Sequence, residues 1–459
     1  MTRPNTVKIL QVLPVAPPPG TTISTAPTSL PSTYFDIVCL RASPAERLFF
    51  YEFPHPTTSF FDSVLPKLKH SLSFTLQHFP PLAGNLVWPH ESPKPIIRFV
   101  PGDALSLTIA QSDSDLNHIS GTNPCEALEH YPLVPHLTTS HEKTSVLAVQ
   151  ITLFPGSGFS IGAVAHHAVL DGKTSTLFLK SWAHICSKLT ETSPSSPPPS
   201  LPENLIPFFD RAVIRDPKDI GAIYINEWTK HDAANSRSVK LWNWDNKIPH
   251  EEIRGTFELT PSDLQKLKES VASELKNKSF PVSKFALTSA YTWACLVKAE
   301  QTESNSVTLI FAADCRSRLE PPIPPTYFGN CISVQRVSLE TKNLLGNDGF
   351  ITALEAISEN LNGLKAGVLN GAETWLSHVG NQSDKKIRIS GSPRFEVYSI
   401  DFGWGRPKKV EMTSIAKKVG AFSVEESRHG NGGIEIGLAL KKSDMEAFSA
   451  LFAEGLESI

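Results

Sequence analysis

Apolar residues recur at helical spacing in some segments of the first half and cluster in short strand-like runs in others. The spacing predicts one helix over 60–79, which a pair of prolines ends, and another over 173–189. The apolar runs 146–154 and 159–164 are typical of strands, and a Pro-Gly-Ser-Gly turn separates them. We therefore expect the first half to mix strands and helices.

The second half has the same character. Thr260 offers a capping hydroxyl, a proline follows it, and an acid stands three residues further on, so a helix should begin there. Apolar periodicity predicts further helices over 285–297 and 443–456. The expected strands are 306–313 and a hairpin pair, 421–424 and 434–440, joined through glycines.

Prolines cluster near the middle of the chain. The run 193–202 reads SPSSPPPSLP, which can form neither a helix nor a central strand. We divide the chain there into an N-terminal domain, 1–190, a crossover linker, 191–220, and a C-terminal domain, 221–459. A chain of 459 residues is too long for one ordinary core, so we expect an α/β fold of two mixed domains.

Charge and composition exclude several classes of protein. The net charge is −3 and no basic block is long enough to neutralise a phosphate backbone, so no nucleic-acid partner is expected. No window approaches the roughly 18 apolar residues of a membrane span, and the proline-broken N-terminus is unlike a signal peptide. We therefore expect a cytoplasmic protein. The cysteines lie far apart without a CxxC pair, which favours small core residues over a metal site.

The sharpest chemical feature is the segment 166–172, HHAVLDG, between a predicted strand and a predicted helix. An imidazole there could act as a general base, because its ordinary pKa lies near neutrality. The alternative is a pair of partly buried histidines that serve only the fold. Asp171 could orient the ring or could hold the turn through an arginine. Joint metal binding by the two histidines is disfavoured, because neighbouring strand residues point to opposite faces.

Two other motifs contain glycines and aromatic residues. The segment 401–407, DFGWGRP, contains neither a good base nor a nucleophile, and we interpret it as a structural turn. In the segment 327–331, YFGNC, Gly-Asn favours a turn, and the aromatic residues could line a pocket or pack in a core. The sequence contains no HExxH motif and no P-loop.

The sequence resembles the plant BAHD family of acyl-CoA-dependent acyltransferases through HHAVLDG at 166–172 and DFGWG at 401–405. The resemblance covers essentially the whole chain. It implies two similar-sized domains of the chloramphenicol acetyltransferase-like type, joined by a long crossover, with a solvent channel between them. Coenzyme A would enter the channel from one face and the acceptor from the other. Acyl-CoA would be a co-substrate, with no permanently bound cofactor and no metal.

The resemblance also implies roles for single residues. His167 would be the general base, and Asp171 would be structural, paired with an arginine for which Arg316 is the candidate. Ser390 would supply a hydroxyl to the oxyanion, although the tryptophan that accompanies it in some members is missing here. The structural motif away from the reacting atoms would consist of Asp401, Gly403, Trp404 and Gly405.

Within the family, YFGNC at 327–331 resembles the branch that acylates flavonoid and anthocyanin glycosides, often from malonyl-CoA. The acceptor would then be a sugar hydroxyl of a phenolic glucoside, and the enzyme a monomer. A malonyl donor needs a cation near its free carboxylate, and we consider Arg254, Lys284 and Lys180. Further candidates for the substrate pocket are Tyr327, Phe328 and Asn330.

Several alternatives remain open at this point. A family member could use acetyl-CoA or a hydroxycinnamoyl-CoA as donor, or another alcohol as acceptor. A condensation-type domain shares HHxxxDG, and an inactive relative could keep the fold and bind coenzyme A without turnover.

Overall fold

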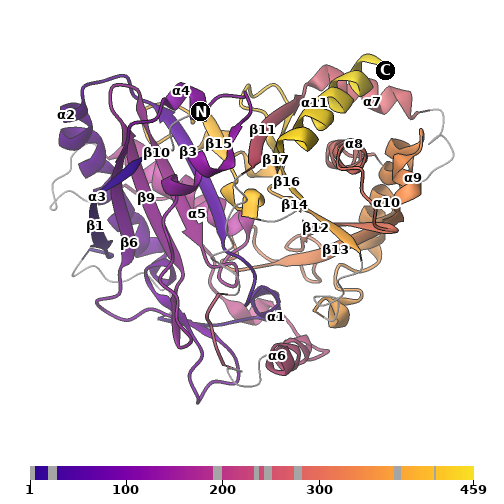
Figure 1. The fold of residues 1–459 in the computed structure, drawn as a ribbon. Coiled ribbons are helices and arrows are strands. Elements are labelled where there is room, and N and C mark those ends of the chain that lie inside the picture. The colour runs from indigo at the N-terminus through magenta and orange to yellow at the C-terminus, as the bar shows by residue number, and fades with distance from the viewer. Residues whose placement is uncertain are drawn as a thin grey trace.

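The computed structural model describes residues 6–18, 28–189, 199–231, 237–241, 251–272, 282–376, 384–417 and 420–459. Figure 1 shows the two halves of the chain side by side, the first in indigo to magenta and the second in orange to yellow. Each half is built around its own large sheet, and helices cover the outer side of the second sheet.

The first half is organised by a six-stranded sheet in the order β1-β6-β9-β10-β3-β15. Its strands are β1 Val7–Val15, β3 Ala45–Glu52, β6 Leu105–Ser112, β9 Leu147–Phe154, β10 Gly158–Ala165 and β15 Lys409–Glu411. The two apolar runs predicted as strands are confirmed as β9 and β10, which pair antiparallel. The predicted second helix is confirmed as α5, Gly172–Lys188.

The helix predicted over 60–79 forms in a modified way. After α2, Thr57–Ser59, a π-helical turn spans Phe60–Val64, and α3, Leu65–His78, completes the helix and packs against α5. Pro66 has no N–H to donate to the preceding turn, which explains why the regular helix begins only there.

The second half is organised by a seven-stranded sheet in the order β13-β12-β14-β16-β17-β11-β7. Its strands are β7 Cys125–Glu126, β11 Glu252–Leu259, β12 Ser306–Asp314, β13 Ile332–Glu340, β14 Lys385–Ser390, β16 Ala421–Glu426 and β17 Ile434–Lys441. Its helices are α7 Pro261–Ser270, α8 Lys284–Ala299, α9 Thr341–Leu345, α10 Gly349–Gly363 and α11 Lys442–Glu457. All the strands and helices predicted for this half are confirmed.

The helices α1, Tyr34–Ile37, and α6, Ile220–His231, approach each other at the lower edge of the molecule in Figure 1. A four-stranded sheet in the order β2-β5-β4-β8 belongs to the first half. The remaining elements are β2 Ser29–Pro31, β4 Asn85–Val87, β5 Ile96–Arg98, β8 Lys143–Ser145, α1 Tyr34–Ile37, α4 Leu116–Ile119 and α6 Ile220–His231.

Each half contributes a strand to the other half's sheet. β15 leaves the second half and pairs with β3, and β7 leaves the first half and pairs with β11. The expected linker 191–220 lies partly outside the described residues; from residue 199 onward it packs its apolar side chains against the first core. The exact domain boundaries stay a prediction.

None of the described helices is both long and apolar enough to cross a membrane. The six cysteines are buried and form no disulfide with one another, as expected for small core residues.

Candidate active site

The two adjacent histidines lie in different environments at the end of β10. His166 is fully buried, and its Nδ1 accepts a hydrogen bond of 3.1 Å from the Ala168 N–H. Burial, helped by the neighbouring His167, lowers the pKa of His166 to about 3, so this ring is neutral at physiological pH. His167 is only partly buried, and its carbonyl accepts a hydrogen bond of 2.8 Å from Asn330 Nδ2. Of the two residues, His167 is therefore the one that solvent reaches.

Asp171 holds the turn that carries His167. Its Oδ1 accepts the Thr174 N–H at 2.9 Å and thereby caps the N-terminus of α5. Its two oxygens also accept hydrogen bonds from Arg316 at 2.8 and 3.2 Å, and Oδ2 accepts the Cys331 N–H at 3.0 Å. These contacts occupy the carboxylate and support a structural role for it.

Arg316 joins this turn to the second half of the chain. Its side chain is 1% exposed and forms the bidentate ion pair expected with Asp171. The same guanidinium donates to the carbonyls of Tyr327 and Gly329 at 3.2 and 2.9 Å. A charge so deeply buried is tolerated because both terminal nitrogens of the guanidinium have partners, and these fix the His167 turn against the YFGNC segment.

Asp314, at the end of β12, extends the cluster toward solvent. It accepts from Arg316 at 2.9 Å and from Lys173 at 3.0 Å. Burial opposes the ionisation of Asp314, but the two positive charges outweigh it and lower the pKa of that carboxyl below its usual value.

A second buried carboxylate, Asp36 of α1, supports the other side of the site. It accepts both the backbone and the side-chain N–H of Asn330 at 3.0 Å, and Arg211 pairs with it at 3.0 Å. Arg211 also donates to the Tyr327 hydroxyl at 2.8 Å. A chain of hydrogen bonds therefore runs from α1 through Asn330 to the His167 carbonyl.

Tyr327, Phe328 and Asn330 are each 0% exposed and contact other protein groups, so the structure brings them to the site as packing and bonding residues. Phe328 packs against Phe79 and Phe209. Whether they also contact a substrate stays a prediction.

Ser390 lies at the carboxyl end of β14. Ile310 of β12 pairs with Arg388 of β14, and this parallel register, continued by two residues, sets Ser390 level with Ala312. Ala312 is exposed although β12 is an interior strand, so solvent reaches this face of the sheet. Asp314 ends the same strand β12, which brings Ser390 to the edge of the sheet from which Arg316 extends.

The cations considered for a malonyl carboxylate have protein partners. Arg254 is buried in an ion pair with Glu411, and Lys284 donates to the Gly432 carbonyl at 2.8 Å. Lys180 pairs with Glu396 at 3.0 Å. These contacts leave their binding role without structural support.

The DFGWG segment forms a tight turn far from His167. Asp401 Oδ1 accepts the N–H groups of Gly403 and Gly405 at 2.7 and 3.0 Å, and both glycines have positive φ, 106° and 103°. Phe402 packs edge-on against Trp182 of α5, with ring centroids 4.8 Å apart, and Trp404 packs against Phe159 at 6.1 Å. Phe159 is the second residue of β10 whereas His167 follows the end of that strand, a separation of about 25 Å along a strand.

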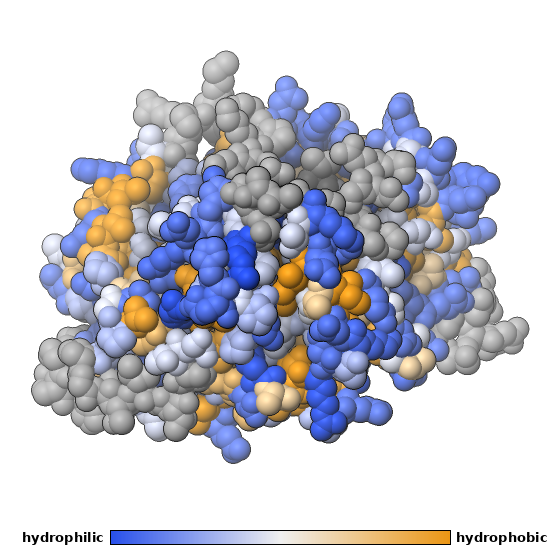
Figure 2. Space-filling model, turned by 90° about the horizontal axis from the view of Figure 1, so that it is seen from below, coloured by the Kyte–Doolittle hydropathy of each residue, from blue (hydrophilic) through white to orange (hydrophobic). Residues whose placement is uncertain are grey.

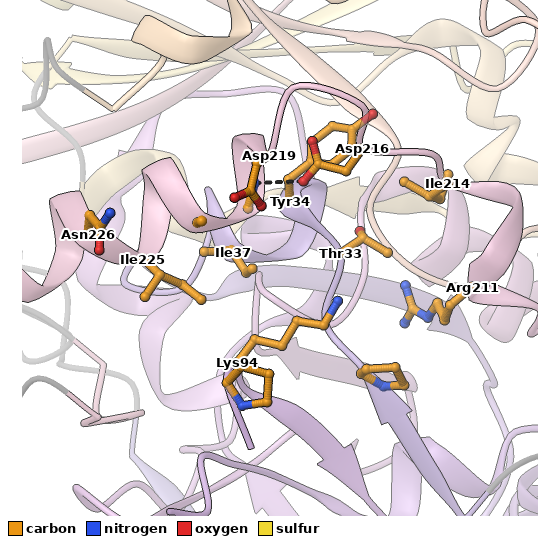
Figure 3. Close-up of a pocket in the computed structure, with 14 residues that line it drawn as sticks. Thr33, Tyr34, Ile37, Lys94, Arg211, Ile214, Asp216, Asp219, Ile225 and Asn226 are labelled. Carbon is orange, nitrogen blue, oxygen red and sulfur yellow. Dashed lines mark hydrogen bonds between the residues drawn. The ribbon is translucent and has the colours of Figure 1, made fainter. Parts of the chain in front are cut away.

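A cavity of about 370 Å³ lies between α1 and α6, on the side of the molecule from which Figure 2 is viewed. Figure 3 shows its mixed lining: Ile37, Ile214 and Ile225 are apolar, whereas Lys94, Asp219 and Asn226 are polar. Thr33 is part of the wall, and its hydroxyl donates to Asp36 at 2.9 Å. The cavity is therefore connected to the His167 carbonyl by the hydrogen bonds of Asp36 and Asn330.

Sequence reasoning missed Asp36, Thr174 and Arg211. Each is an ordinary residue in the sequence, and only the pairing of distant segments reveals its role. A helix-capping pattern at Asp171 was the one signal that could have placed Thr174.

Solved structures first define the class of fold. Vinorine synthase superposes with a TM-score of 0.69 at 19% identity over 96% of both chains. TRI101 of F. sporotrichioides, in complex with coenzyme A and T-2, gives 0.64 at 16% identity over 92% of this chain and 96% of that one. The chain thus has the two-domain fold of the CoA-dependent acyltransferases, as the motifs implied.

Sequence comparison then identifies the family. The model of the Transferase family matches residues 24–454, so the chain belongs to this family, which includes the plant BAHD acyltransferases. A malonyl-CoA:anthocyanidin 5-O-glucoside-6''-O-malonyltransferase of Arabidopsis thaliana is 42% identical over 98% of both chains. Phenolic glucoside malonyltransferase 1 of the same plant is 39% identical over 99% of this chain and 98% of its own.

Proposed function

We propose that the protein is an acyl-CoA-dependent O-acyltransferase that moves a malonyl group to a sugar hydroxyl of a flavonoid or other phenolic glucoside. The observation that carries the proposal is the His167 turn, which the buried Asp171–Arg316 pair fixes where the two halves of the chain meet. The full-length similarity to the plant glucoside malonyltransferases supports the choice of donor and acceptor.

The mechanism is direct transfer in a ternary complex. His167 takes the proton of the acceptor hydroxyl as its oxygen attacks the thioester carbonyl. The Ser390 hydroxyl donates a hydrogen bond to the oxyanion that forms. When the intermediate collapses, the carbon–sulfur bond breaks and protonated His167 returns the proton to the departing coenzyme A thiolate. No covalent acyl-enzyme is needed.

The cavity beside α1 is our candidate for the acceptor side of the channel. A phenolic glucoside has a flat apolar ring and a hydroxyl-rich sugar, and the lining of the cavity offers groups for both. We further propose the domain division 1–190, 191–220 and 221–459, a monomeric state and a cytoplasmic location.

The decisive test measures coenzyme A thiol release with malonyl-, acetyl- and hydroxycinnamoyl-CoA, each with a panel of phenolic glucosides. We expect malonyl-CoA with a glucoside to be the best pair. Turnover confined to another donor, or to an acceptor without a sugar, would replace the specificity proposed here, and no turnover with any pair would indicate an inactive relative.

His167→Ala should lower kcat by about 10²- to 10⁴-fold, because the acceptor hydroxyl then lacks a base. The matched control is His184→Ala, since His184 is also partly buried but lies beyond the middle of α5. Near-normal turnover by a folded His167→Ala protein would refute the assignment.

A further inference from the structure

Two arginines stand in one row on the inner face of the seven-stranded sheet, by which we mean the face opposite α8 and α10. Ile310 of β12 pairs with Arg336 of β13 on one side and with Arg388 of β14 on the other. Paired residues of neighbouring strands project to the same face. The flanking residues Leu309 and Ile387 belong to the core under the helices, so the two arginines project the other way.

The space in front of this row contains solvent. β14 lies between β12 and β16, yet the Arg388 side chain is exposed, and so is Ala312 two residues beyond Ile310. Side chains in the middle of a sheet are exposed only where no layer of protein packs on them. The row therefore lines an open space on the inner face.

No described carboxylate neutralises either arginine. Among the residues that the structure describes, no carboxylate forms an ion pair with Arg388 or Arg336, and Arg336 donates only to the Trp375 carbonyl, at 2.8 Å. Desolvation lowers the pKa of the half-buried Arg336 guanidinium, and the neighbouring charge of Arg388 lowers it further. Two neighbouring positive charges with no counter-charge in the described part of the chain create an electrostatic preference for an anion.

The row also lies close to the proposed reaction centre. Ser390 follows Arg388 by two residues on the same strand and face, a spacing of about 6.6 Å. If Ser390 donates a hydrogen bond to the thioester carbonyl oxygen, the Arg388 side chain is long enough to contact a substrate group close to that carbonyl. The cations expected from the sequence, by contrast, are each held by a protein partner.

We propose that Arg388, assisted by Arg336, binds a carboxylate of a substrate in the channel. The proposal rests on the proposed function and refines its substrate specificity. A guanidinium binds a carboxylate through two parallel hydrogen bonds, which fixes the orientation of the ligand as well as its charge. The carboxylate has two possible sources, the free end of the malonyl donor or an acid group on the acceptor.

The test compares matched substrate pairs with the full chain and its Arg388→Gln variant. The donor pair is malonyl-CoA and acetyl-CoA, and the acceptor pair is 2-carboxyphenyl β-D-glucoside and 2-(hydroxymethyl)phenyl β-D-glucoside. We expect kcat/KM for the carboxylated member of one pair to fall about 10- to 100-fold, while its uncharged partner changes little. A donor-selective loss assigns the carboxylate to malonyl, and an acceptor-selective loss assigns it to the glucoside.

The control is Lys386→Gln, which removes a charge from the same face of β14 but two residues further from Ser390. This variant should leave the ratio of kcat/KM values unchanged within the donor pair and within the acceptor pair. Arg388→Lys, which keeps the charge and loses the paired hydrogen bonds, should fall between wild type and Arg388→Gln. It also keeps the test valid if the glutamine variant does not fold. Equal losses for all four substrates, or no loss for any, would overturn the proposal.

Calorimetric binding separates this proposal from the proposed function. Dissociation constants of the two donors and of the two glucosides need no turnover, so they report on Arg388 even in an inactive protein. Failure to transfer an acyl group refutes the function alone. If Arg388→Gln leaves the ratio of dissociation constants unchanged within each substrate pair, the carboxylate site alone is refuted.

Discussion

Two junctions hold the halves of this protein together, and they differ in chemistry. The polar junction consists of Asp171 and Thr174 from the first half with Arg316 and Asn330 from the second. The aromatic junction packs Phe402 and Trp404 of the second half against rings of β3, β10 and α5, namely Tyr51, Phe159 and Trp182. Both junctions use α5, at positions separated by about 16 Å along the helix.

The difference separates positioning from stability. Buried ion pairs gain little net free energy because desolvation offsets their attraction, but they permit only one geometry. Aromatic burial stabilises strongly and tolerates small displacements. The protein places the polar junction beside His167, the base that we propose, and the aromatic junction a strand's length away.

The largest effect is expected from Asp171→Asn. The substitution keeps the shape of the side chain and removes the charge that faces Arg316, so it should lower the free energy of unfolding by about 3 kcal/mol. Because the His167 turn loses its clamp, kcat should also fall, by about 100-fold or more. Chemical denaturation and thiol-release kinetics measure the two effects.

Asp314→Asn is the matched control, since Asp314 contacts the same guanidinium but its side chain is 38% exposed. Solvent screens this pair, so its loss should cost about 1 kcal/mol or less and leave kcat within a few-fold of wild type. Equal effects of the two substitutions would contradict the idea that the Asp171 pair alone fixes the turn. If Asp171→Asn lost activity at unchanged stability, a direct catalytic role for Asp171 would be favoured.

Phe402→Ala should have nearly as large an effect on stability but little on chemistry. Phe402 is 1% exposed against Trp182 and Tyr51, and removing a ring from such a site costs about 3–4 kcal/mol. Activity per folded molecule, measured well below the melting temperature, should stay within about threefold of wild type. A loss of kcat comparable to that of Asp171→Asn would show that the aromatic junction also positions the reacting groups.

The elements of this fold could be predicted largely from local pattern. The strands β9 and β10 and the helices α5, α8 and α11 follow from periodicity and turns that the chain carries within each segment. The exchange of β7 and β15 between the sheets could not be foreseen, because strands of two or three residues carry no period. Their pairing depends on which edges the completed sheets leave open.

The candidate site was predictable only where a motif marks it. HHAVLDG and its resemblance indicated His167 and Asp171, and Arg316 was a reasonable partner. Asp36 and Arg388 carry no local signal. The sequence around a residue does not show whether a carboxylate is buried in the fold or whether an arginine on a strand reaches solvent. Their roles arise from contacts across 294 positions for Asp36 and Asn330, and from strand pairing for Arg388.

The last effect concerns the response to acid of His166, five residues before Asp171 of the polar junction. His166 has a folded-state pKa of about 3 against an ordinary value of 6.5. Below pH 6.5 the unfolded chain binds a proton at this residue and the folded protein does not, so stability falls as the pH decreases toward 3. Above pH 6.5 the residue imposes no such penalty. Its contribution to the slope is about 1.4 kcal/mol per pH unit.

His166→Gln removes this proton and keeps an oxygen that can accept the Ala168 N–H. The free energy of unfolding of the variant, measured from pH 6 to pH 4, should therefore fall less steeply than that of wild type. The difference between the two slopes should be at most about 1.4 kcal/mol per pH unit. The aromatic junction contains no group that titrates in this range, so Phe402→Ala should lower the whole curve without changing its slope. A His166→Gln curve parallel to wild type would mean that the ring is protonated in the folded state. His166 would then add no sensitivity to acid beside the polar junction, and the contrast between the two junctions would rest on their geometry.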